Sequence, residues 1–88
     1  MMPDAPYLPI SVPAFGRLPA GCVPTLAGWL CETGETVRRG ERVVELTVPG
    51  VMVDALSPAD GTLVRQNLAA GAKVDANEPL GWVERTND

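Results

Sequence analysis

The sequence of 88 residues contains no histidine, and this absence excludes several kinds of chemistry at once. Without an imidazole there is no histidine general base, no Ser–His pair and no histidine ligand of the kind that most zinc enzymes use. The two cysteines, Cys22 and Cys31, match no metal-ligand or redox spacing. We expect them to be free thiols in a reducing compartment, with a disulfide as the alternative. The sequence therefore predicts no catalytic residues and no metal site.

Positive charge and long apolar runs are also scarce. Seven basic residues against eleven acidic ones give a net charge of −4, which disfavours nucleic acid and anionic membranes as partners. The uncharged stretch from Leu18 to Leu30 is broken by two prolines and two glycines and is too short to span a bilayer. The start, Met1-Met2-Pro3-Asp4, lacks the basic and apolar segments of a secretory signal. We expect a cytoplasmic protein.

Helix breakers, by contrast, are frequent and evenly spread. Nine glycines and nine prolines leave no room for a long helix, while an apolar content of 45% is enough for a packed core. Short runs rich in Val, Thr and Leu alternate with turn residues, which indicates an all-β sandwich or barrel. The expected strands are 10–12, 25–31, 43–48, 51–56, 62–68 and 80–84. We predict a flexible tail over 1–9, one domain over 10–85 and a short tail over 86–88.

Two stretches of the chain resemble each other at an offset of 37 residues. Placing 24–47 over 61–84 gives five identities in 24 positions. The identical pairs are Thr25/Thr62, Leu26/Leu63, Gly34/Gly71, Val37/Val74 and Glu41/Glu78. One such half cannot bury its own apolar face, so we predict two related halves that pack face to face.

Six motifs, in the same order, resemble a lipoyl domain of the dihydrolipoyl acyltransferases of 2-oxoacid dehydrogenase complexes. The longest, over 25–41, contains Trp29, the turn Gly34-Glu35-Thr36-Val37 and the pair Gly40-Glu41. The others include Val12-Pro13-Ala14-Phe15-Gly16, Ser57-Pro58-Ala59-Asp60-Gly61 and Ala70-Gly71-Ala72-Lys73-Val74. Biotinyl carrier domains share the fold, and Trp29 favours the lipoyl branch. The resemblance implies a flattened barrel-sandwich hybrid of two four-stranded antiparallel sheets with pseudo-twofold symmetry.

The resemblance also implies lipoic acid or biotin on a lysine at the tip of an exposed hairpin, with the tip sequence Glu-Thr-Asp-Lys-Ala. Counting back from Gly61 places that lysine on Gly50, flanked by Thr47, Pro49 and Val51. Glycine has no amine to acylate, so we expect no cofactor at this position. Pro49-Gly50 suits a type II turn and predicts a hairpin. The alternative to a turn that only closes the hairpin is an apolar tip that binds a partner.

Lys73 is the only lysine in the sequence and so the only other acceptor. It lies in a different turn and lacks the flanking residues of the family, which favours a solvated turn residue. Arg38, Arg39 and Arg42 are interspersed with acidic residues, which indicates a mixed solvated face rather than an anion site. Trp29 and Trp82 are expected to be half-buried packing residues.

Three functions remain open. The favoured one is a non-catalytic interaction module with a protein partner, related to lipoyl domains and lacking their prosthetic group. The second is a working lipoyl or biotinyl carrier modified at Lys73. The third, a stand-alone enzyme, is disfavoured because no nucleophile has a neighbouring base. The chain also resembles, more loosely, the lysine-free barrel-sandwich modules of membrane-fusion and transport proteins, but the short Pro49-Gly50 link argues against these.

Overall fold

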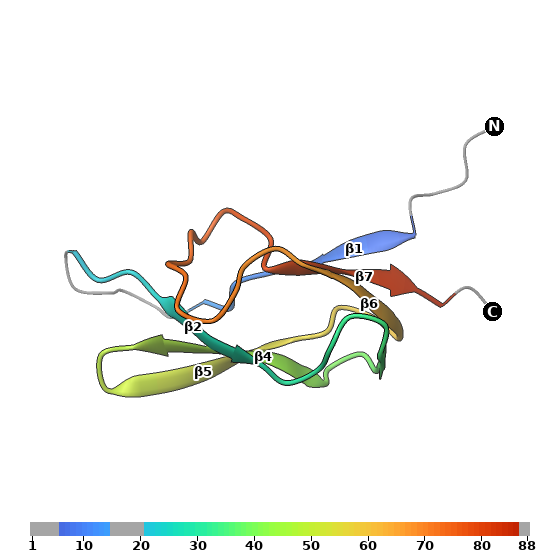
Figure 1. Ribbon diagram of the computed structural model, residues 1–88, viewed down its shortest axis with the longest axis horizontal. Helices are drawn as coiled ribbons and strands as arrows, with labels where there is room; N and C mark the ends of the chain where they lie inside the picture. Colours follow the sequence, from blue (N-terminus) through green and yellow to red (C-terminus); the bar gives the residue numbers. More distant parts are fainter. Residues whose placement is uncertain (1–5, 15–20, 87–88) are drawn as a thin grey trace.

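The computed structural model describes residues 6–14 and 21–86, and within them the chain is built from β-strands alone. The strands are β1 (Tyr7–Ile10), β2 (Thr25–Trp29), β3 (Thr36–Val37), β4 (Arg42–Val48), β5 (Val51–Leu56), β6 (Gly61–Gln66) and β7 (Gly81–Arg85). One antiparallel sheet has the order β1-β7-β6-β3, and the other has the order β2-β4-β5 (Figure 1). The all-β fold is thus confirmed. The described residues contain no helix, in agreement with the predicted absence of a long helix.

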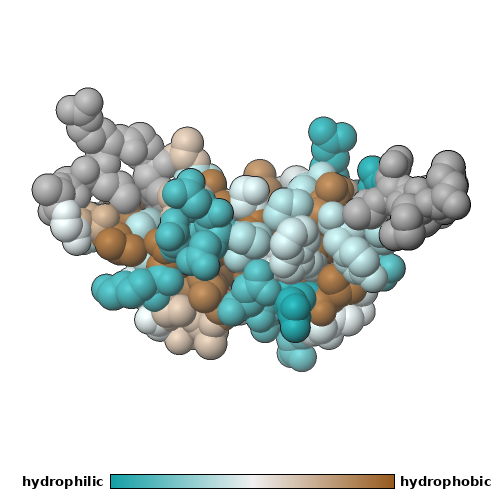
Figure 2. Space-filling view, turned by 90° about the horizontal axis from the view of Figure 1, so that it is seen from above, coloured by the Kyte–Doolittle hydropathy of each residue, from teal (hydrophilic) through white to brown (hydrophobic). Residues whose placement is uncertain are grey.

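The two sheets enclose one hydrophobic core. Inward positions of the strands alternate with outward ones, as the period of two in a half-buried strand requires. The largest fully buried side chains are Ile10, Leu26, Val37, Val43, Val44, Leu46, Leu63, Val74, Leu80 and Val83. Both tryptophans are half-buried, as predicted. On the face seen in Figure 2, apolar and polar groups are mixed.

The 37-residue repeat is visible in the backbone hydrogen bonds. The N–H of Gly34 donates to the carbonyl of Leu63 at 2.7 Å, and the N–H of Gly71 donates to that of Leu26 at 2.8 Å. Each residue of the second bond lies 37 positions from its equivalent in the first. The register shifts at Leu26/Gly28 in β2 and at Leu63/Arg65 in β6 are equivalent in the same way. The predicted duplication therefore describes a real pseudo-twofold arrangement.

The second sheet has three strands rather than the expected four. By the repeat, residues 73–74 should pair with β2 as β3 pairs with β6, but only a single bridge between Lys73 and Thr25 forms. The N–H of Val74 donates to the carbonyl of Pro24 at 2.9 Å. Because proline has no amide hydrogen, Pro24 cannot return a bond to Val74, whereas Gly61 holds the equivalent place opposite Val37. The fourth strand is thereby reduced to one bridge.

The first strand also begins earlier than the sequence indicated. Tyr7–Ile10 pairs with β7, so residues 7–9 lie in a strand rather than in the tail assigned to them, and 11–12 do not. Pro9 is tolerated because β1 is an edge strand, where one missing N–H leaves the ladder to β7 intact. The rest of the predicted tails, 1–5 and 87–88, and the motif residues Phe15 and Gly16 lie outside the described residues. The domain limits at 10 and 85 stay predictions.

Candidate functional site

The candidate site is the tip of the hairpin formed by β4 and β5. The ladder between these strands ends at the pair Val48–Val51, which leaves Pro49 and Gly50 as a two-residue turn. Gly50 has a φ of +80°, the left-handed value that the third residue of a type II turn adopts. Proline at the second position fixes φ near the value that the same turn needs. The predicted hairpin is therefore present, with Pro49-Gly50 at its end.

The tip is open and apolar. Val51 and Met52 are 52% and 59% exposed, while a Cβ built on Gly50 would meet no other atom within 4 Å. There is thus space for a side chain at Gly50, although its φ would strain any residue other than glycine by about 1 kcal/mol. Thr47 and Pro49 provide no carboxylate beside this position. The exposed groups at the tip are suited to apolar contact rather than to ionic recognition.

Lys73 lies closer to this hairpin than its place in the sequence suggests. It bridges to Thr25, Thr25 pairs with Thr47, and Thr47 pairs with Met52. Directly paired residues of antiparallel strands present their side chains on the same face of a sheet. Lys73, Thr25, Thr47 and Met52 therefore form one row across the outer face of the second sheet. Sequence reasoning missed this row, although applying the repeat to β3 would have placed Lys73 beside β2.

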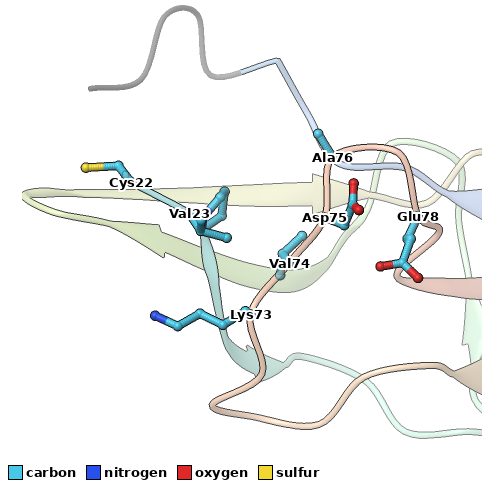
Figure 3. A pocket seen from close by; sticks show the side chains of 8 residues that line it. Cys22, Val23, Lys73, Val74, Asp75, Ala76 and Glu78 are labelled. Carbon is cyan, nitrogen blue, oxygen red and sulfur yellow. The ribbon is translucent and has the colours of Figure 1, made fainter. Parts of the chain in front are cut away.

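An open depression connects Lys73 with the hairpin. Its lining includes Cys22, Val23, Lys73, Thr47 and Pro49. The lysine side chain extends away from Asp75 and Glu78, its nearest acidic neighbours along the chain (Figure 3). Lys73 is exposed, and its pairing with Thr25 places it on the same face of the sheet as Thr25 and Thr47.

The arginine cluster behaves as a solvated face. Arg38, Arg39 and Arg42 are all exposed, and the Arg42 side chain forms an ion pair with Asp54 at 3.5 Å. The backbone N–H of Arg39 donates to Asp60 Oδ1 at 2.8 Å. A long, exposed ion pair of this kind contributes little to stability. Their exposure and their contacts with acidic residues are typical of a mixed solvated face.

The two halves are joined by side chains near the opposite end of β2. Trp29 Nε1 donates to the carbonyl of Leu68 at 2.8 Å, and Gln66 Nε2 donates to the carbonyl of Cys31 at 2.9 Å.

Both cysteines are free thiols, with Cys31 buried. Burial raises the pKa of the Cys31 thiol, and the charges of Glu35 and Glu41 raise it further. Cys31 is consequently a packing residue with little thiolate at neutral pH.

Other kinds of site are not formed by the described residues. Over 6–14 and 21–86, no group of three His, Cys, Asp or Glu side chains is close enough to hold a metal ion. In the same ranges, no helix is long and apolar enough to cross a membrane.

Two sheets related by a pseudo-twofold axis, with an exposed hairpin at one end, define a domain of the lipoyl and biotinyl attachment type. Residues 9–83 match the biotin/lipoyl family, described as "Biotin-requiring enzyme", and the chain belongs to this family. It is also similar to the solution structure of the lipoyl domain of the 2-oxoglutarate dehydrogenase complex from Azotobacter vinelandii. That similarity has a TM-score of 0.68 and 29% identity, and it covers 89% of this chain and 98% of the other. No curated protein sequence gives a significant match.

The residues at the hairpin tip do not fit the prosthetic group of the family. Lipoic acid and biotin are carried through an amide to a lysine amine, and neither Pro49 nor Gly50 supplies an amine. Domains of this family are carriers rather than catalysts, and the absent amine leaves this tip without the carrier chemistry.

Proposed function

We propose that this protein is a non-catalytic, cytoplasmic relative of lipoyl domains that carries no lipoic acid or biotin and acts through contact with a protein partner. The observation that supports the proposal is Gly50. Our alignment assigns this residue to the acceptor position, and it occupies the turn of the exposed hairpin with a φ of +80°. A lipoyl domain with glycine at that position has the scaffold of a carrier and no attachment point.

The partner we propose is a component of a larger assembly related to the 2-oxoacid dehydrogenase complexes. The solved structure similar to this chain comes from the 2-oxoglutarate dehydrogenase complex, which supports this context. Lipoyl domains present their hairpin tip to partner enzymes. Here the tip residues Val51 and Met52 are exposed apolar groups, which suit a protein surface better than solvent.

The absence of modification is tested by intact mass. The wild-type protein is incubated with a lipoate ligase, ATP and lipoate, and separately with a biotin ligase, ATP and biotin. We expect the mass to stay at 9.3 kDa, because the tip has neither the amine nor an acidic flank. An adduct on the wild-type protein would contradict the proposal.

Variants of the tip test whether the alignment is correct. Gly50→Lys alone is expected to give little labelling, because Thr47 and Pro49 do not supply the acidic flank of the family. Adding Thr47→Glu and Pro49→Asp should give appreciable labelling. A triple variant that folds, as judged by circular dichroism, but remains unlabelled would show that the acceptor position lies elsewhere.

A second candidate, a carrier modified at Lys73, is supported by the row Lys73–Thr25–Thr47 that leads to the hairpin. Lys73→Arg distinguishes the two functions, since it keeps the positive charge and removes the acceptor. If the wild type were labelled and Lys73→Arg were not, the carrier function would replace the one proposed. Combining Lys73→Arg with the triple variant also ensures that any adduct is on the introduced lysine.

A further inference from the structure

Strand β5 is a free edge of the second sheet. Its six residues pair with β4 on one side, and in the order β2-β4-β5 it is the last strand (Figure 1). Within the described part of the chain, no backbone hydrogen bond links Val51–Leu56 to any element other than β4. The outer backbone groups of β5 are therefore available to another strand.

The other strand edges are protected in ways that β5 is not. Edge strands usually avoid pairing with other chains through proline, lysine, bulges or short length. β1 contains Pro9 and follows Pro6, β3 is only two residues long, and the outer side of β2 is bridged by Lys73. β5 has neither proline nor lysine, and its Met52 and Leu56 are 59% and 49% exposed. β5 is thus an edge suited to pairing.

The turn geometry shows which backbone groups face outward. In a two-residue hairpin the residues that flank the turn, here Val48 and Val51, form a hydrogen-bonded pair. Pairs then alternate along the ladder, so Thr47–Met52 and Glu45–Asp54 are not hydrogen-bonded to each other. Met52 and Asp54 therefore present their N–H and C=O groups to the free edge.

We propose that two copies of this protein associate through antiparallel pairing of their β5 strands across a twofold axis. The bare backbone groups require an extended strand as the occupant, and antiparallel self-pairing matches the outward groups of one copy with the same groups of the other. The two three-stranded sheets become one continuous sheet.

Charge selects the register of this pairing. Residues whose backbone N–H and C=O groups face outward in one copy must lie opposite such residues in the other copy. Among the registers that meet this condition, the two with the longest overlap place either Val53 or Asp54 on the twofold axis. With Asp54 on the axis, two carboxylates would lie directly opposite each other, which is destabilising. With Val53 on the axis, Asp54 opposes the partner's Met52. Val53 pairs with the buried Leu46 and so faces the core side, where a second apolar side chain is favourable.

The net charge predicts how salt affects the association. Each copy carries a formal charge of −4, so the two copies repel each other at long range. The single acid of β5, Asp54, is already paired with Arg42. Screening should therefore strengthen the dimer, whereas an interface held by ion pairs would weaken with salt.

The association is tested by sedimentation equilibrium over a wide range of protein concentration, at low and high sodium chloride. Because the shared strand is short, we expect weak pairing, with a mean mass that rises from 9.3 kDa toward twice that value and rises further in salt. A mass of 9.3 kDa at every concentration would overturn the proposal. A dimer that dissociates in salt would also overturn it.

Three variants locate the interface. Met52→Pro removes an outward N–H and leaves the ladder to β4 intact, so we expect a folded monomer at all concentrations. Met52→Asp should have the same effect, because it places a second carboxylate opposite the partner's Asp54, while Val23→Asp makes the same change at an exposed apolar residue outside β5 and should leave the dimer intact. Circular dichroism and the unfolding midpoint verify that each variant is folded. A Met52→Pro variant that folds and dimerises like the wild type would exclude β5.

Cross-linking tests the register. In a Cys22→Ser background, Val53→Cys places two thiols at a non-hydrogen-bonded pair on the axis, with Cα atoms about 4.5 Å apart, within the range of a disulfide. Oxidised glutathione would convert the two thiols into one disulfide and be reduced to two glutathione thiols. We expect Val53→Cys to cross-link faster than Asp54→Cys. The reverse order would place Asp54 on the axis and overturn the register.

Discussion

The two halves of the repeat, 25–48 and 62–85, form equivalent hydrogen bonds but end differently. In the first half, β4 continues through Pro49-Gly50 into β5, which closes a hairpin. In the second half, β7 pairs with β1 instead, a strand from the start of the chain, so the equivalent end is open. The two ends lie at opposite extremes of the molecule (Figure 1). The repeated bonds specify the fold, and the candidate site lies at the end that the second half does not reproduce.

The halves also differ in the side chains that join them. Trp29 in β2 is equivalent to Gln66 in β6, and Val44 in β4 is equivalent to Gly81 in β7. A Cβ on Gly81 would lie only 2.8 Å from the Trp29 ring. The larger aromatic side chain of one half is therefore accommodated by the absence of a side chain in the other. Substitutions that disturb the packing of the Trp29 ring against Gly81 should have the largest effects on stability.

The largest effect is expected for Gly81→Ala, the smallest step toward the valine of the first half. The added Cβ would collide with the carbonyl oxygen of Arg65 as well as with Trp29, and the backbone cannot move aside without disturbing the β6–β7 ladder. We expect a loss of about 3 kcal/mol in the free energy of unfolding, measured in urea.

The matched control for this substitution is Gly28→Ala. Its Cβ would meet no atom within 4 Å, so the change should stay within about 0.5 kcal/mol. Equal losses at Gly81 and Gly28 would show that the close contacts with Arg65 and Trp29 are not what requires glycine at position 81.

Exchanging Trp29 for the residue of the second half is expected to have the next largest effect. Trp29→Gln keeps a donor for the carbonyl of Leu68 and removes the ring that packs over Gly81, so we expect a loss of about 2 kcal/mol. Trp29→Phe keeps most of the ring and removes the donor, and should cost about 1 kcal/mol. Urea unfolding of both variants separates packing from hydrogen bonding. A larger loss for Trp29→Phe than for Trp29→Gln would reverse this assignment.

Much of the fold could be predicted because its signals are local or repeated. The turn at Pro49-Gly50 follows from the φ preferences of two adjacent residues, and the repeat follows from matched glycine and valine positions. Predicting the single bridge at Lys73 would have required one further step, the recognition that Pro24 has no amide hydrogen to donate. The strand at Tyr7–Ile10 was placed too late because Pro9 is usual only in an edge strand, and edges are defined by sheet order.

The candidate site could be predicted only in part for the same reason. The tip residues are neighbours in the sequence, so turn chemistry identifies them. The row from Lys73 to Met52 joins four segments, and the free edge of β5 exists only because no strand follows it in the sheet. Both depend on long-range pairing, which a single sequence does not specify.

The two turn glycines sharpen the comparison between the halves. Gly34 and Gly71 have φ values of +98° and +91°, and each donates an equivalent hydrogen bond to the other half. Gly34→Ala and Gly71→Ala should therefore each cost about 1 kcal/mol, the penalty of a side chain in the left-handed region. Urea unfolding of the two variants side by side measures the difference. A difference above about 1 kcal/mol would show that the halves are not equivalent at their turns.

The smallest effect is expected where the halves differ on the surface. Lys73 is equivalent to Thr36, and both are exposed residues that pair with a threonine, Thr25 and Thr62 respectively. Lys73→Thr replaces an exposed lysine with a residue that favours strands, so we expect a change within about 0.5 kcal/mol in urea unfolding. The reciprocal Thr36→Lys is its control and should be equally mild. A loss well above that value for Lys73→Thr alone would mean that the lysine side chain holds the single bridge to β2 in place. If the change is as small as expected, Lys73→Thr gives a folded protein without any lysine, in which no ligase can attach lipoate or biotin through a lysine side chain.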